Sequence, residues 1–140
     1  MQSPLEKAIS IALKAHAGQI DKAGAPYILH PLRLMMQMKT ENEKLVAVLH
    51  DVVEDSNTTL GDLKLAGFPD EVLQAVDILT HRETDSYEQY LAGIKPNPLA
   101  LAVKLADLHD NSQLSRIKTP LAKDFQRIEK YQKAISFLNS

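Results

Sequence analysis

The sequence of 140 residues is 44% hydrophobic and 24% charged, with a formal net charge of −2 at pH 7. This length suits one domain with a hydrophobic core, and we expect residues 1–140 to form a single domain. The mixed, nearly balanced charge argues against a broad nucleic-acid-binding surface. The absence of cysteine excludes disulfides, thiolate chemistry and cysteine-based zinc sites.

No segment resembles a signal peptide, and no apolar run reaches the length of a membrane-spanning helix. We therefore expect a cytoplasmic protein with no membrane partner and no nucleic-acid partner. The sequence leaves the oligomeric state open.

Helix-capping patterns recur along the chain. Ser3 and Glu6 form a capping box, and Thr40 is followed three residues later by Glu43 in the same pattern. In chain order, the predicted helices cover residues 3–18, 31–39, 41–55, about 59–67, 69–80, 86–94, 97–114 and about 120–138. No run alternates long enough to predict a strand. The predicted fold class is therefore all-α, a single bundle of about seven or eight helices.

The segment VLHDVVEDS contains four ionisable residues in an otherwise apolar run: His50, Asp51, Glu54 and Asp55. Burying such groups costs free energy unless they are paired or bound to a metal. At about 100° per residue, all four side chains fall within one arc of about 140° on a regular helix. The apolar run before His50 places it and Asp51 in the middle of that helix. The arc is either a solvated acidic face or a cation site, since neighbouring carboxylates repel one another.

Two further polar residues stand in unusual places. His30 lies where a loop becomes a helix, a position at which a histidine is more often structural than a ligand. Asp107 lies in an apolar helical run, with Lys104 and Asn111 on the same side. A buried Asp–Lys ion pair is the simplest explanation of Asp107. The neighbouring Asp110 is expected to point toward another side, at the surface.

Taken together, these residues suggest a metal site. Two imidazoles and two carboxylates from three helices could hold one divalent ion: His30, His50, Asp51 and Asp107. Mixed nitrogen and oxygen ligands suit manganese, iron or zinc better than calcium or magnesium. Such an ion lowers the pKa of a bound water, whose proton a nearby carboxylate could accept.

Four segments resemble, in order and spacing, a family of HD-domain metal-dependent phosphohydrolases: AHAGQ, PYILHP, LHDVVEDSNTTL and VKLADLHDN. The resemblance covers about residues 15–111 and is to the hydrolase domain of RelA/SpoT-type alarmone enzymes and their small stand-alone relatives. It implies a single HD-type helical domain. It also implies removal of the 3′-pyrophosphate from a guanosine alarmone such as ppGpp, giving pyrophosphate and GDP or GTP.

The resemblance assigns a role to each matching residue. Glu54 and Asp55 match an acidic pair that positions and activates the attacking water. The residues that match the family's metal ligands, usually for manganese, are His30, His50, Asp51 and Asp107. At the nucleotide substrate, the resemblance implies roles for Lys22, Tyr27 and Asn111. We also expect Lys104 there, since Lys104 or Lys22 could balance the charge of the leaving pyrophosphate.

One position departs from the family pattern. Asp21 stands where the long enzymes usually carry an arginine, whose guanidinium can stack on a purine. The link HRETDSYEQY could also supply a different pocket wall, through Arg82, Tyr87 and Tyr90. Another nucleotide or phosphate ester, such as ppApp or a dNTP, is therefore an alternative substrate. A nucleotide-binding regulatory module without turnover is a further alternative.

Overall fold

The computed structural model describes residues 2–140, and the prediction of an all-α helical fold is confirmed. No strand occurs in that range, where an isolated bridge pairs Ile20 with Pro26. The helices are α1 (Pro4–Ala15), α2 (Leu29–Gln37), α3 (Glu41–Leu49), α4 (Val52–Asp55), α5 (Leu60–Leu65), α6 (Asp70–Leu79), α7 (Tyr87–Ile94), α8 (Pro98–Asn111) and α9 (Ala122–Leu138), with a short 3-10 helix at Leu114–Arg116.

Capping side chains fix several helix starts where the sequence predicted them. The Ser3 hydroxyl accepts a hydrogen bond from the N–H of Glu6 at 3.2 Å, and Thr40 accepts one from Glu43 at the same distance. In each pair the glutamate side chain accepts in return from the N–H of the capping residue. Each box therefore satisfies two backbone donors that the helix itself cannot pair.

The helix predicted over residues 41–55 is divided into α3 and α4. At the break, Asp51 adopts φ −104° and ψ −2°, and the Nδ1 of His50 donates to the carbonyl oxygen of Ala47 at 2.7 Å. A continuous helix would pair that carbonyl with the N–H of Asp51. The imidazole competes for it, as polar side chains near a helix end commonly do. The placement of His50 and Asp51 in mid-helix is therefore wrong.

The last helix also starts later than predicted. Thr119 and Pro120 were expected to begin it, but α9 begins at Ala122. The side chain of Asp124 accepts from the N–H of Leu121 at 2.8 Å and closes the first turn. This bond is the half of a capping box that satisfies the N-cap residue. Leu121 itself has no side-chain acceptor for the N–H groups of the first turn.

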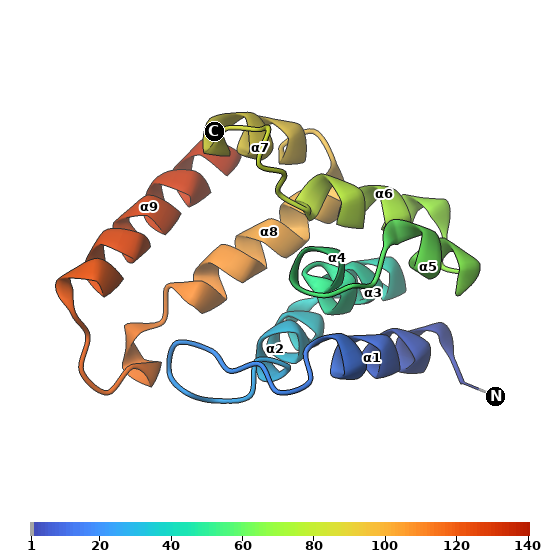
Figure 1. The fold of residues 1–140 in the computed structure, drawn as a ribbon. Coiled ribbons are helices and arrows are strands. Elements are labelled where there is room, and N and C mark those ends of the chain that lie inside the picture. The colour runs from blue at the N-terminus through green and yellow to red at the C-terminus, as the bar shows by residue number, and fades with distance from the viewer. Residues whose placement is uncertain (1) are drawn as a thin grey trace.

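Helix α3 lies at the centre of the fold and packs against α1, α2, α6 and α8 (Figure 1). Its segment 45–49 is at most 1% exposed, so the C-terminal end of α3 is anchored in the core. Helix α9 packs on α8 and α7 at the other side of the molecule (Figure 1). The α3–α4 break, the start of α2 and the C-terminal half of α8 are thereby brought together. Within residues 2–140, no helix is both long and apolar enough to cross a membrane.

Candidate metal centre and adjoining cleft

The structure brings together the four residues predicted to bind a metal. One potential ligand atom from each of them lies within 4.8 Å of all the others: His30, His50, Asp51 and Asp107. His30 comes from the start of α2, His50 and Asp51 from the α3–α4 break, and Asp107 from α8. Both histidines and Asp107 are buried, while Asp51 is partly accessible. The cluster is a possible metal site.

His50 shows why the cluster suits a cation. Its Nδ1 donates to the carbonyl oxygen of Ala47, so the neutral ring carries a lone pair on Nε2. This Nε2 lies 3.1 Å from Oδ2 of Asp51 and 3.4 Å from Oδ1 of Asp107. Among residues 2–140, the same buried atom has no hydrogen-bond partner. A lone pair facing carboxylate oxygens is unfavourable unless a positive charge lies between them.

The electrostatics of the cluster point the same way. Burial lowers the pKa of His50, but the carboxylates of Asp51 and Asp107 raise it well above its ordinary value. Burial raises the pKa of Asp107, whereas Lys104 and the two histidines lower it well below its ordinary value. The cluster thus favours positive charge, as a site for a divalent cation does.

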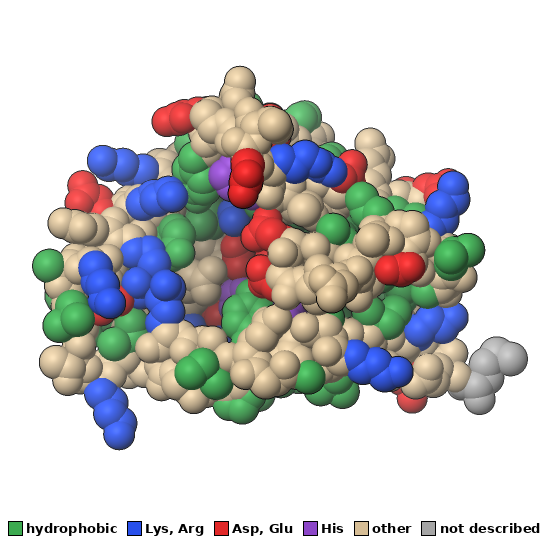
Figure 2. Space-filling view, in the orientation of Figure 1, with side chains coloured by type: hydrophobic (Ala, Val, Ile, Leu, Met, Phe, Trp, Pro, Cys, Tyr) green, Lys and Arg blue, Asp and Glu red, His purple; other side chains and the backbone are tan. Residues whose placement is uncertain are grey.

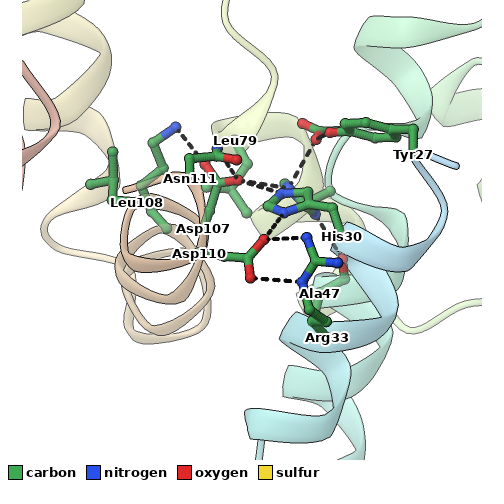
Figure 3. Close-up of polar contacts among 12 residues, drawn as sticks. Tyr27, His30, Arg33, Ala47, Leu79, Asp107, Leu108, Asp110 and Asn111 are labelled. Atoms are coloured by element: carbon green, nitrogen blue, oxygen red, sulfur yellow. Dashed lines mark hydrogen bonds and ion pairs between the residues drawn. The ribbon is translucent and has the colours of Figure 1, made fainter. Parts of the chain in front are cut away.

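His30 is held from both sides. Its Nδ1 lies 2.6 Å from Oδ2 of Asp110, and its Nε2 lies 2.8 Å from Oδ1 of Asp107 (Figure 3). Asp110 also receives two hydrogen bonds from Arg33, from Nε and Nη2, each at 2.8 Å. The expectation that Asp110 lies at the surface is therefore wrong, since it is 6% exposed. Its signal in the sequence was its spacing of three residues from Asp107, which puts both on one helix face.

Asp107 makes the ion pair that the simplest explanation required. Lys104 Nζ lies 3.1 Å from Oδ2 of Asp107, and Asn111 Nδ2 donates to Oδ1 at 3.2 Å. The lysine and the histidines therefore approach different carboxylate oxygens. The ammonium of Lys104 also lies 5.2 Å from the centre of the Tyr90 ring. An ion pair and a place in the cluster are thus compatible for Asp107.

Tyr27 contacts the cluster directly. Its hydroxyl donates a hydrogen bond to Oδ2 of Asp51, and its ring centre lies 5.5 Å from that of His30. Burial and the charge of Asp51 raise the pKa of Tyr27 well above its ordinary value. The phenol therefore stays protonated and holds Asp51 in place.

Glu54 and Asp55, on the one-turn helix α4, are exposed beside the cluster. Partial desolvation of the Asp55 carboxyl group, together with the charges of Asp51 and Glu54, raises its pKa to about 6. Oε1 of Glu54 accepts from the backbone N–H of His81 at 2.7 Å. Both acids line a hollow of about 270 Å³ that also reaches His50 and Asp51. Figure 2 shows acidic and histidine side chains deep in a hollow near the middle of this face.

The opposite wall of this hollow is formed by residues of α7, α8 and α9, together with His81. Tyr87 and Tyr90 line it, as the sequence suggested, but Arg82 instead pairs with Asp77 on α6. The imidazole of His81 stacks on the Tyr90 ring, with ring centres 4.5 Å apart. The sequence predicted only that His81 lies in a polar link, and its place in the wall of the hollow was not predicted. Its place depends on how the link between α6 and α7 folds back toward α4.

A second cleft, of about 370 Å³, adjoins the hollow and shares Tyr27, Asn111 and Tyr131 with it. It is lined by four cationic residues: Lys22, Arg33, Arg116 and Arg127. Lys22 was expected at the substrate, but the three arginines were missed. They come from three separate parts of the chain, so no local pattern connects them. In Figure 2, Lys and Arg side chains gather to the left of the hollow.

Asp21 lines the same cleft but has a structural task. Its Oδ1 accepts from the backbone N–H groups of Ala23 and Ala25, each at 2.9 Å. This carboxylate therefore closes the loop before α2, as aspartate commonly does in turns. The guanidinium groups that line this cleft come from Arg33, Arg116 and Arg127.

No family model matches this chain. It is 31% identical over 131 residues to a probable GTP pyrophosphokinase of Mycobacterium leprae, covering 84% of this chain and 16% of that protein. It is 28% identical over 119 residues to a guanosine-3′,5′-bis(diphosphate) 3′-pyrophosphohydrolase of Aquifex aeolicus, covering 76% of this chain and 17% of that protein. Over 64 residues it is 41% identical to the bifunctional (p)ppGpp synthase/hydrolase SpoT of Escherichia coli, covering 43% of this chain and 9% of that protein.

The chain is homologous to the hydrolase region of RelA/SpoT proteins, an HD-type domain. It spans about a sixth of the length of the first two relatives. A solved structure of a metazoan SpoT ortholog, described as hydrolysing ppGpp, has the same fold. It gives a TM-score of 0.80 at 21% identity and covers 99% of this chain and 86% of that one.

Proposed function

We propose that this chain is a metal-dependent phosphohydrolase that removes the 3′-pyrophosphate from (p)ppGpp, releasing pyrophosphate and GDP or GTP. The observation that carries the proposal is the buried cluster of two histidines and two aspartates beside the acidic pair of α4. The homology to the hydrolase region of RelA/SpoT proteins supports the substrate class.

We assign the metal to the cluster of His30, His50, Asp51 and Asp107, with manganese as the native ion. A donor set of two imidazoles and two carboxylates suits such a borderline ion. When bound, it supplies a Lewis acid and lowers the pKa of a coordinated water. Hydrogen bonds hold two of these ligand residues in place: Tyr27 binds Asp51, and Asp110 binds His30.

Glu54 and Asp55 are assigned to position the attacking water and accept its proton. A carboxylate with a pKa of about 6, such as Asp55, is mostly ionised at neutral pH. Its pKa is also close enough to neutral pH for it to accept a proton. The N–H of His81 binds one oxygen of Glu54 and so orients the other. This bond fixes an otherwise exposed side chain without using its second oxygen.

Cationic side chains are assigned to the phosphates of the nucleotide. Lys104 lies beside Asp107 at the base of the hollow, where it can balance the negative charge of the leaving pyrophosphate. Lys22 lines the adjoining cleft and is assigned to the remaining phosphates. Tyr27 and Asn111 border both the hollow and the cleft. This position suits the sugar that joins the phosphate groups of the nucleotide.

A second candidate is hydrolysis of another nucleotide at the same metal site, either removal of the 3′-pyrophosphate from ppApp or cleavage of the 5′-triphosphate of a dNTP. It is favoured by Asp21, whose carboxylate is used to close its own loop where a base-stacking arginine is usual in the long enzymes. Base recognition in this chain must then use other groups.

The test is pyrophosphate release by the purified protein with Mn²⁺ or with EDTA. The substrates are ppGpp, pppGpp, ppApp and dGTP, and phosphate is counted with and without added pyrophosphatase. We expect Mn²⁺-dependent pyrophosphate release from ppGpp. Release from ppApp or dGTP but not from ppGpp supports the second candidate. No release from any 3′-pyrophosphorylated nucleotide contradicts the proposed reaction.

A further inference from the structure

Asp110 lies against His30 on the side of the imidazole that faces away from the metal cluster. Its Oδ2 lies 2.6 Å from Nδ1 of His30, and the two side chains are 4% and 3% exposed. A proton on Nδ1 is therefore bound to this carboxylate, which leaves Nε2 of the same ring for the cluster. Asp110 thus selects both the orientation of the imidazole and the nitrogen that faces Asp107.

Arg33 in turn fixes Asp110. Its Nε and Nη2 donate to the two carboxylate oxygens, each at 2.8 Å, in the paired arrangement that a guanidinium makes with a carboxylate (Figure 3). Arg33 follows His30 by three residues on α2, so both project toward α8 from one helix face. Arg116 adds a third cationic contact, at 3.3 Å from Oδ2 of Asp110.

We infer that Asp110 and Arg33 are positioning residues that set the metal affinity of the cluster through His30. The inference rests on the metal site of the proposed function. A ligand histidine whose second nitrogen is bound to a carboxylate loses less freedom on binding the ion and is a stronger donor. Arg33 keeps the Asp110 carboxylate ionised and fixes its orientation. Without a charged partner, burying this carboxylate would cost free energy.

The test is calorimetric titration of Mn²⁺ into the metal-free protein and four variants. Asp110→Ala removes the acceptor and should weaken binding roughly ten- to a hundred-fold, the usual effect of losing such a partner. Asp110→Asn restores a neutral acceptor and should recover part of that affinity. Arg33→Gln should weaken binding less than Asp110→Ala, and Arg33→Lys should weaken it less again, because it keeps the charge but not the paired geometry.

A matched control separates positioning from general loss of stability. Asp124 is also 6% exposed and paired with an arginine, Arg127, at 2.9 Å, but it caps α9. Asp124→Ala should lower the melting temperature while leaving the Mn²⁺ affinity at the wild-type value. Titrations are made at a temperature where circular dichroism shows each variant folded. If Asp110→Ala does not fold, the two Arg33 variants decide, since that side chain is 32% exposed and reaches the surface.

Nitrogen NMR of the protein loaded with diamagnetic Zn²⁺ gives a second readout. We expect the proton of His30 on Nδ1 in the wild type, and exchange broadening or loss of that signal in Asp110→Ala. Wild-type binding of Mn²⁺ with unchanged affinity in the Asp110 and Arg33 variants overturns the inference and leaves the proposed function standing. A wild-type protein that binds no divalent ion overturns both.

Discussion

The metal centre and the adjoining cleft are built in different ways, although they share Tyr27 and Asn111 at their border. The ligand atoms of the metal centre come from helices and a helix break anchored in the core, and most of these residues are buried. In the cleft, only two of the four cations are on α-helices, Arg33 on α2 and Arg127 on α9. Lys22 comes from the loop before α2, and Arg116 from the segment between α8 and α9.

This difference suggests a division of labour. Side chains held on rigid elements suit chemistry that needs fixed distances, whereas long side chains on loops can change without disturbing the core. We therefore expect substitutions in the centre to act on metal binding and turnover, and substitution of a loop cation such as Lys22 to act on nucleotide binding. Arg33 is different, because it lines the cleft but also holds Asp110 beside His30.

The largest effect is expected at Asp51, which lies between His50 and Tyr27. Asp51→Ala removes a carboxylate from the cluster, so it should abolish both Mn²⁺ binding and hydrolysis. Metal content by mass spectrometry and pyrophosphate release measure the two effects. Wild-type metal content in this variant would remove Asp51 from the ligand set.

A large loss of turnover with metal retained is expected for Glu54. Glu54→Gln keeps the hydrogen bond to the N–H of His81 in place but removes a proton acceptor. Turnover should fall roughly 10²- to 10⁴-fold, the range for losing a general base. Calorimetry should show Mn²⁺ affinity close to that of the wild type. Equal metal loss in the Glu54 and Asp51 variants would contradict the separate roles given to them.

A moderate effect, confined to nucleotide binding, is expected for Lys22. Lys22→Ala should raise KM for the nucleotide on the order of tenfold, equivalent to about 1.4 kcal/mol, with little change in kcat. The Mn²⁺ affinity should stay the same, because Lys22 lies on the exposed loop that lines the cleft. Steady-state kinetics measure the first two quantities. A fall in kcat at constant KM would place Lys22 in the chemistry instead.

The smallest effect is expected at a helix end away from both regions. Thr40→Ala removes the N-cap of α3 and should lower the free energy of unfolding by about 1 kcal/mol. The other end of α3 carries His50 but is held by the core, so Mn²⁺ affinity should not change. Urea unfolding and calorimetry measure the two. Weaker metal binding in this variant would mean that the centre depends on the whole helix.

The sequence predicts the fold class and the cluster well, for physical reasons. Capping boxes mark helix starts locally, and ionisable residues in apolar runs need a compensating partner wherever they fold. His50, Asp51 and Asp107 stand out on that basis, and His30 completes a possible ligand set when the unusual polar residues are taken together. The family resemblance then matches all four.

Other features depend on contacts that no local pattern encodes. The break at Asp51 arises because the His50 imidazole takes a backbone acceptor, which a regular helical wheel does not consider. The contribution of His81 and Arg116 depends on where two connecting segments fold in space.

The position of Asp110, by contrast, was predictable from a local pattern, although the sequence was interpreted otherwise. A spacing of three residues from Asp107 already placed both side chains on one face of α8.

The most direct test is anomalous diffraction at the manganese absorption edge, from crystals grown with Mn²⁺. One anomalous peak, coordinated by both imidazole Nε2 atoms and by the carboxylates of Asp51 and Asp107, is the predicted result. A map with no peak among these side chains, or with the peak at another place, would contradict the claim on which the proposed chemistry depends.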